Sequence, residues 1–350
     1  MAVRSLAPRG GTTAGGPRSP LWSRHLDDYV TALTVSSDGT RVGVATGSGV
    51  LHVLDADSGA IVFERAAHVD GILAAAYAPT GDLLATAGQD GRARVFDPEG
   101  GIHAEVVGSG AWMQHLAWSP DGNRLATTAG GAAHVWTPEG KLVLEIEPEA
   151  SALTGIAWDR AGTRLATCCS RAVTTWDGLT GEQLVRLPTP ATLVSLAWSP
   201  DDAVIACGTE QCSVRFWRLA TGQESEISGF ASKPRALSFN PTGKLLATAG
   251  GKVPSVWRFD GRGPEGMPPA MLNGHDALCT VLAFHPAGTW LATGGDDARV
   301  LIWDPEVSGA TFGEFQLGET VTALAWRPDG RFIHAADASG LVEARLALAP

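Results

Sequence analysis

Apolar and polar residues alternate along this chain in short runs that recur through most of its length. Runs such as "HLAW" at 115–118, "VLAF" at 281–284 and "ALAW" at 323–326 each lead into a polar turn of the form Pro-x-Gly. A run such as "LATAG" at 84–88 follows the turn, and after a second turn comes "ARVFD" at 93–97. A fourth, more polar run completes the unit, as in "EQLVRLP" at 182–188. Period-two alternation in runs of this length predicts four short antiparallel strands per unit.

The turn after the first run of each unit shows how often the unit repeats. Its marker residue recurs at intervals of 40 to 45 residues, at Gly39, Gly81, Gly122, Gly162, Asp202, Gly243, Gly288 and Gly330. A four-stranded sheet with apolar residues on both faces must pack between two neighbours, and repeated sheets of this kind close into a ring. We therefore predict an all-β fold made of eight such units.

One unit carries additional polar residues at defined places. It opens with Gly274-His275, contains the run "LATGG" and closes with Trp303-Asp304. In these features the chain resembles the WD-repeat β-propeller family, and the resemblance extends over roughly residues 21–350. The resemblance implies a structural tetrad of His275, Thr293, Asp297 and Trp303, whose hydrogen bonds connect a loop, two strands and a turn. Each such bond contributes on the order of 1 kcal/mol net.

The same tetrad is only partly present in the other units. The resemblance implies a partial tetrad of His68, Thr86 and Asp90, in which Phe96 replaces the tryptophan and cannot donate a hydrogen bond. Four further units keep the tryptophan but lack the full set of partners, at Trp136, Trp176, Trp217 and Trp257. Apolar stacking between units must therefore hold most of the ring together.

The two ends of the repeated region predict how the ring closes. The last unit has only three strand-like runs, and the short segment "LWSRHL" at 21–26 has no other run to pair with. The family closes its ring by pairing the N-terminal strand with the last blade, which also covers an open sheet edge. We expect eight four-stranded antiparallel blades over residues 21–350, preceded by a disordered tail at 1–20. The alternative is a ring of seven blades with one terminal repeat outside it.

The composition narrows the class of protein. The net charge is −11, whereas nucleic-acid-binding chains usually present a basic face. No apolar run approaches the ~18 residues of a membrane span. Five cysteines, an odd number, suit reduced thiols in a long chain. We therefore expect a cytoplasmic protein that binds neither nucleic acid nor membrane, although the acid-free, Arg-bearing start leaves a transit peptide as a second interpretation.

Motifs of known catalytic chemistry are missing from the sequence. There is no GxSxG elbow, no GxxxxGK[ST] loop and no HExxH pair. The adjacent acids Asp201-Asp202 and Asp296-Asp297 fall at predicted hairpin turns, where aspartate is common for backbone reasons. Cys168 and Cys169 are consecutive on a strand, so their side chains point to opposite faces and cannot easily share an ion. We expect no enzyme activity, no cofactor and no metal site.

A small set of residues at the predicted mouth of the ring points to protein binding. Trp112 stands just before a strand, where most other units have a small or polar residue, although it could also fold onto its own blade. The candidate partner-binding residues are Tyr29, Trp112, Gln114, Lys233, Arg235 and Leu278. The two cations could guide an acidic partner segment into an otherwise acidic protein. The sequence thus favours a non-catalytic scaffold for one or more protein partners, and the alternative is a small-ligand or metal-handling accessory protein with a site in the central channel.

Overall fold

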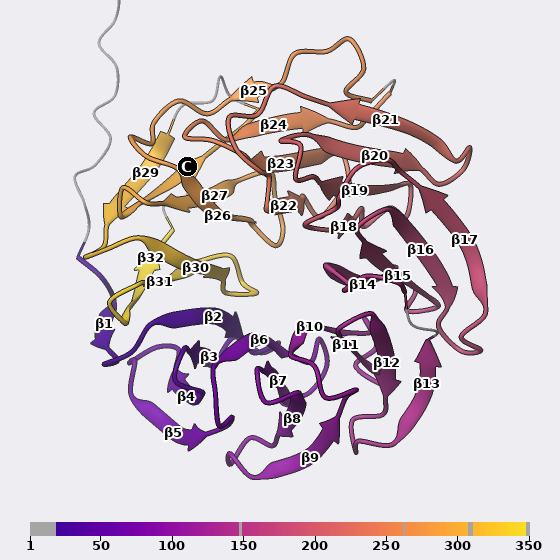
Figure 1. Cartoon of the computed structure of the whole chain (residues 1–350). Coiled ribbons are helices and arrows are strands. Elements are labelled where there is room, and N and C mark those ends of the chain that lie inside the picture. The colour runs from indigo at the N-terminus through magenta and orange to yellow at the C-terminus, as the bar shows by residue number, and fades with distance from the viewer. Residues whose placement is uncertain (1–18, 147–148, 262, 307–310, 348–350) are drawn as a thin grey trace, which may run out of the picture.

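The strands of the protein form a closed ring of eight separate sheets, as the computed structural model shows (Figure 1). The structure describes residues 19–146, 149–261, 263–306 and 311–347. Each sheet has four strands, and strands that are neighbours in a sheet pair antiparallel. The first strands of adjacent sheets face one another around the centre of the ring. The predicted all-β fold with eight blades is confirmed, and the seven-blade alternative is wrong.

The blades follow the chain in order, and each runs from an inner strand to an outer one. Blade 1 contains β2 (Val30–Val35), β3 (Arg41–Thr46), β4 (Val50–Asp55) and β5 (Ile61–Ala66). Blade 2 contains β6 (Ile72–Tyr77), β7 (Leu84–Gly88), β8 (Arg92–Phe96) and β9 (Ile102–Val107). Blade 3 contains β10 (Met113–Trp118), β11 (Leu125–Ala129), β12 (Ala132–Trp136) and β13 (Leu142–Ile146). Blade 4 contains β14 (Gly155–Trp158), β15 (Arg164–Cys169), β16 (Ala172–Asp177) and β17 (Gln183–Pro188).

The second half of the ring repeats this order with two shortened strands. Blade 5 contains β18 (Ala197–Trp198), β19 (Val204–Gly208), β20 (Val214–Arg218) and β21 (Gln223–Ile227). Blade 6 contains β22 (Ala236–Phe239), β23 (Leu245–Ala249), β24 (Ser255–Arg258) and β25 (Ala270–Met271). Blade 7 contains β26 (Cys279–Phe284), β27 (Leu291–Gly295), β28 (Arg299–Trp303) and β29 (Thr311–Gln316). Blade 8 contains β30 (Val321–Trp326), β31 (Phe332–Asp337), β32 (Leu341–Leu346) and, as its outer strand, β1 (Trp22–His25).

Blade 8 is completed by the N-terminal strand. β1 pairs antiparallel with β32, with Trp22 opposite Ala344 and His25 opposite Leu341. The indole of Trp22 is buried and donates a hydrogen bond to the carbonyl oxygen of Ala56 in blade 1, 2.8 Å away. The predicted closure by an N-terminal strand is thus observed, and the outer edge of β32 is covered.

The blades are held to one another by buried apolar side chains and by a repeated tryptophan contact. In blades 3, 4 and 8 the tryptophan that ends the first strand donates its indole N–H to a carbonyl oxygen of the preceding blade, whereas the indole N–H of Trp198 in blade 5 has no partner among the described residues. Trp118 reaches Ala76 at 3.0 Å, and Trp158 reaches Ala117 at 3.1 Å. Because these indoles are also buried in the clusters between blades, they contribute both apolar contact and a satisfied polar group.

Seven of the eight residues that mark the repeat adopt the left-handed backbone conformation, and Gly288 is the exception. Gly122, for example, has a φ of 72°. Asp202, which takes the marker position in blade 5, also has a positive φ of 59°, a conformation that aspartate tolerates better than most residues. The pair of acids at 201–202 therefore serves the turn, as the sequence predicts.

Candidate functional site: the loop face of the ring

The most connected polar group lies in blade 7, where the four residues of the tetrad meet. The His275 Nε2 and the Thr293 Oγ1 lie 2.8 Å apart, and Trp303 Nε1 donates to the same hydroxyl at 2.8 Å. The His275 Nδ1 lies 3.0 Å from the nearer oxygen of Asp297. Because a carboxylate can only accept, Nδ1 carries the proton and Thr293 donates to Nε2. Burial lowers the pKa of His275, although Asp297 opposes the shift, so the ring is neutral at neutral pH.

Blade 2 assembles a similar group, but its third strand carries a phenylalanine in place of the tryptophan. His68 contacts Asp90 through Nδ1 and Thr86 through Nε2, both at 2.8 Å. Phe96 is buried at the tryptophan position, and Arg94 donates to Asp90 at 2.8 Å. Burial lowers the pKa of His68. The structure thus brings the partial tetrad together and adds Arg94, which sequence reasoning did not identify because an arginine in the middle of a strand has no distinguishing pattern.

Both groups hold one face of the ring, which we call the loop face. It consists of the loops that enter each first strand and the turns between each second and third strand. Within a blade these two segments are joined by backbone hydrogen bonds, such as Gly47 N–H to Tyr29 O at 2.8 Å and Asp296 N–H to Leu278 O at 2.8 Å. The tetrads are therefore structural supports under this face.

Four exposed apolar side chains lie on the loop face, one in each of blades 1, 2, 3 and 7. Trp112 is 54% exposed, Tyr29 51% and Leu278 38%, so none of the three belongs to the core of its blade. Val69 is 85% exposed in the corresponding loop of blade 2 and was missed by sequence reasoning, because a lone valine in a loop carries no signal. The structure thus places Trp112 at the surface, where it is free to contact another molecule.

The two predicted cations also lie on this face, but they share an acid. Lys233 forms an ion pair with Glu210 of blade 5, and Arg235 Nη2 lies 3.9 Å from the same carboxylate. Their side chains remain 42% and 67% exposed. Gln114, on β10 next to Trp112, is exposed as well. Glu210 therefore offsets part of the positive charge that the sequence suggests at the mouth of the ring.

The described residues hold neither a cluster of metal-binding side chains nor a helix that could span a membrane. Residues 19–146, 149–261, 263–306 and 311–347 contain no group of three or more His, Cys, Asp or Glu side chains placed to hold a metal ion. None of the described segments is a helix long and apolar enough to cross a membrane. Cys168 packs in the cluster between blades 4 and 5, and Cys169 packs in the cluster between blades 3 and 4. These two cysteines thus point to opposite faces of their strand, as the sequence predicts.

Comparison with known proteins agrees with this architecture. The family model described as "WD domain, G-beta repeat" matches residues 59–97, 104–137, 181–218 and 266–304. With four matched repeats and eight four-stranded blades, the chain is an eight-bladed β-propeller that matches the WD-repeat family. Sqt1 from Chaetomium thermophilum superposes with a TM-score of 0.80, over 92% of this chain and 97% of that chain. At 21% identity this likeness shows the fold alone.

Two curated relatives match parts of the chain. The anaphase-promoting complex subunit cdc20 of Dictyostelium discoideum is 30% identical over 142 residues, which cover 39% of this chain and 27% of that protein. The target of rapamycin complex subunit wat1 of Schizosaccharomyces pombe is 33% identical over 114 residues, which cover 32% of this chain and 35% of that protein. The chain thus spans about a third or less of the length of these relatives.

Proposed function

We propose that this protein is a non-catalytic scaffold that binds one or more protein partners through the loop face. The exposed indole of Trp112 is the observation that supports this proposal most directly. Two relatives are named as subunits of larger complexes, which fits a role in assembly. We also place the protein in the cytoplasm, because its five cysteines are all unpaired and suit a reducing compartment.

The aromatic side chains exposed on the loop face are of the types that contribute most to binding free energy at protein interfaces. Tryptophan and tyrosine dominate the small set of side chains that carry most of the affinity at protein interfaces. Trp112 and Tyr29 are both more than half exposed, and the loop of Tyr29 is joined to the next turn of its blade by the hydrogen bond from Gly47 N–H to Tyr29 O. A rigid support lowers the entropic cost of binding, because the anchor side chain is already positioned before the partner arrives.

The charges suggest how a partner approaches. Lys233 and Arg235 stay exposed beside Glu210 and give their part of the face a net positive charge. The chain as a whole carries a net charge of −11, so an acidic partner segment is attracted to this part of the face and repelled elsewhere. Gln114 can add hydrogen bonds next to the aromatic anchor.

A binding comparison tests the scaffold proposal. Partners are cross-linked to the wild-type chain in native cells, identified by mass spectrometry and then measured singly against purified Trp112→Ala. We expect about 30-fold weaker binding, which corresponds to the 2 kcal/mol or more that a buried aromatic anchor contributes, with an unchanged Tm. Val185→Ala, which truncates a 48% exposed apolar residue on an outer strand, is the control and should bind normally. Equal partner binding by Trp112→Ala and the wild type would rule out Trp112 as the anchor.

A further inference from the structure

Blade 6 has a shorter outer strand than any other blade. β25 spans two residues, Ala270–Met271, whereas the outer strands of the other blades have four to six residues. Of the described residues, 259–261 and 263–269 stand between β24 and β25 and belong to neither strand. Trp257 is half-buried, whereas the tryptophans at the same position in other blades are buried, namely Trp136, Trp176, Trp217 and Trp303.

The polar support of this tryptophan is also different. Phe230 occupies the place that His68 and His275 occupy in their blades, and its ring centroid lies 6.4 Å from that of Trp257. The indole Nε1 donates to the Ser255 hydroxyl at 3.0 Å and approaches the Thr248 hydroxyl at 3.3 Å. Because the N–H is satisfied inside the blade, the exposed part of the indole offers apolar surface to a ligand.

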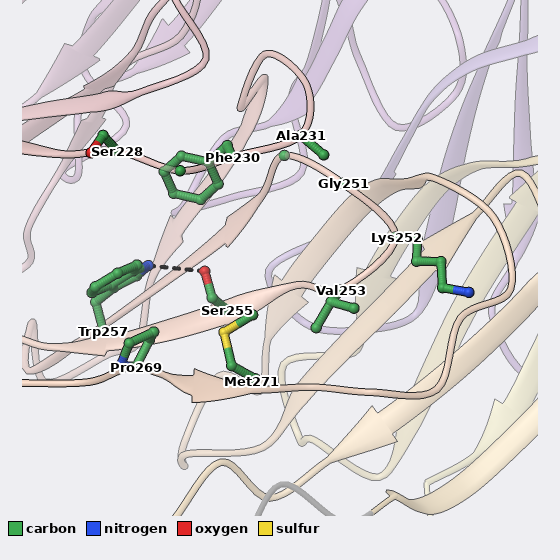
Figure 2. Close-up of a pocket in the computed structure, with 12 residues that line it drawn as sticks. Ser228, Phe230, Ala231, Gly251, Lys252, Val253, Ser255, Trp257, Pro269 and Met271 are labelled. Atoms are coloured by element: carbon green, nitrogen blue, oxygen red, sulfur yellow. Dashed lines mark hydrogen bonds between the residues drawn. The ribbon is translucent and has the colours of Figure 1, made fainter.

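A cavity of about 400 Å³ opens beside this indole. Figure 2 shows Phe230 on one side, with Trp257 and Met271 on the other and Ser255 between them. A second hollow of about 410 Å³ also borders Trp257 and is lined by Met267. Both volumes fall within the range of roughly 300–1,000 Å³ that is usual for ligand sites.

The methionines next to these hollows fit a binding role. Met271 is 49% exposed and Met267 is 55% exposed, and they are two of only four methionines in the chain. Methionine side chains are flexible and polarisable, so they adapt to apolar groups of different shapes. Gly250 and Gly251 form part of the cavity wall, and the absence of a side chain at these positions lets a peptide backbone approach closely.

The charge at the cavity is positive. Lys252 lines the cavity, is exposed, and forms no ion pair with any residue in the described part of the chain. The loop that carries Lys233 is joined to this turn by the hydrogen bond from Ser232 N–H to Gly250 O, 2.8 Å long. Glu210 pairs with both Lys233 and Arg235, so it offsets only part of the charge of these two cations. Lys252 adds a further positive charge beside them. An anionic group next to an apolar one therefore matches this site in charge and in polarity.

We propose that the blade 6 cavity is a second binding site, for a segment of a partner protein in which large apolar side chains stand next to acidic residues. The apolar side chains lie between Phe230, Trp257 and Met271, and the acidic residues lie toward Lys252. The site is distinct from Trp112, which belongs to blade 3, so it can be tested separately from the proposed function.

Three short peptides test this assignment. Each contains a Leu-Phe pair, flanked by glutamates, by serines or by lysines, and carries a fluorophore for polarisation measurements on the purified full chain. We expect the glutamate-flanked peptide to bind most tightly and the lysine-flanked peptide most weakly. Hydrogen exchange should slow in 228–233 and 250–257 when the first peptide binds. Failure of the glutamate-flanked peptide to bind at millimolar concentration, or protection elsewhere on the ring, would overturn the proposal.

Matched variants separate the cavity from general surface effects. Met271→Asp places a charge among the apolar walls and should weaken the glutamate-flanked peptide by about tenfold or more. Leu142→Asp, on the outer strand of blade 3 and 44% exposed, is the control and should bind normally. Lys252→Glu should invert the order of the three peptides, whereas Lys141→Glu makes the same charge change on an exposed residue of blade 3 and should not. If the peptides keep their order in Lys252→Glu, the charge match is wrong, and this result holds even if Met271→Asp fails to fold.

Discussion

The indole N–H of Trp22 donates a hydrogen bond to the carbonyl oxygen of Ala56, 2.8 Å away, across the seam where the ring closes. Trp22 belongs to the outer strand of blade 8, and Ala56 follows the third strand of blade 1. The first strand of the repeated region thus pairs within the last blade and also contacts the first one. The stability of the whole ring should therefore depend on this strand.

Truncation of Trp22 tests that dependence. Trp22→Ala removes a side chain that is 8% exposed, together with its hydrogen bond, and should lower the free energy of unfolding by about 3 kcal/mol or more. Urea unfolding followed by circular dichroism measures the change. Leu21→Ala, which truncates the 49% exposed neighbour, is the control, and deletion of residues 1–19 should likewise have little effect. A Trp22→Ala protein as stable as these two would show that the seam does not limit stability.

The histidine below this seam should make the protein sensitive to acid. His334 is fully buried, its ring lies 5.7 Å from that of Trp22, and burial lowers its pKa from 6.5 to about 4. Between these two pKa values the unfolded chain binds a proton that the folded chain does not. The free energy of unfolding should therefore fall as the pH drops from about 6.5 toward 4, with His334 contributing up to about 3 kcal/mol.

Replacement of this histidine isolates its share of the pH dependence. Burial also lowers the pKa of His68 and His275, so the wild type should lose stability in acid through several groups of the same sign. Urea unfolding at pH 7.5 and pH 5 should show a smaller difference for His334→Phe than for the wild type. The same difference in both proteins would mean that His334 is not the acid-sensitive group.

The hydroxyl at the centre of the blade 7 tetrad should be important for stability. Thr293→Val leaves the ring nitrogen of His275 and the indole N–H of Trp303 buried without their shared partner. We expect a loss of about 3 kcal/mol in the free energy of unfolding. Thr128→Val is a matched control, because the Thr128 hydroxyl is buried in blade 3 without a hydrogen-bond partner among the described residues. That substitution should be neutral or stabilising, and an equal loss in both variants would contradict the role of the tetrad.

One turn glycine near the seam should tolerate no side chain. Gly340 has a φ of +94°, and a Cβ there would lie 1.7 Å from the carbonyl oxygen of Leu26. Gly81 also has a positive φ, of +76°, but a Cβ at that position meets nothing within 4 Å. Gly81→Ala should cost about 1–2 kcal/mol of unfolding free energy through backbone strain alone. Gly340→Ala should cost at least about 2 kcal/mol more in the same urea experiment, and similar losses would show that the loop of Leu26 can move aside.

The blade count could be predicted from the sequence because each blade is built from segments close together in the chain. The turn residues from Gly39 to Gly330 recur at nearly constant intervals, and strands that follow one another through short turns pair with one another. Ring closure could be inferred for a related reason, since a three-stranded last unit and an unpaired N-terminal run complement each other. The His275 and His68 groups were predicted through the resemblance of their residues to the tetrad of the WD-repeat family.

What the sequence did not determine depends on contacts between blades and on the exposure of single side chains. The sharing of Glu210 by Lys233 and Arg235 joins loops of two neighbouring blades, and neither loop has a pattern that predicts it. The exposure of Trp112 follows from the path of its loop, because both a buried and an exposed position were compatible with its spacing. Trp257 matches the buried tryptophans in sequence, yet it is only partly buried, beside an outer strand β25 that pairs over only two residues. Strand periodicity is local and can be read along the chain, whereas the surface around a side chain is decided by segments that meet only when the ring is closed.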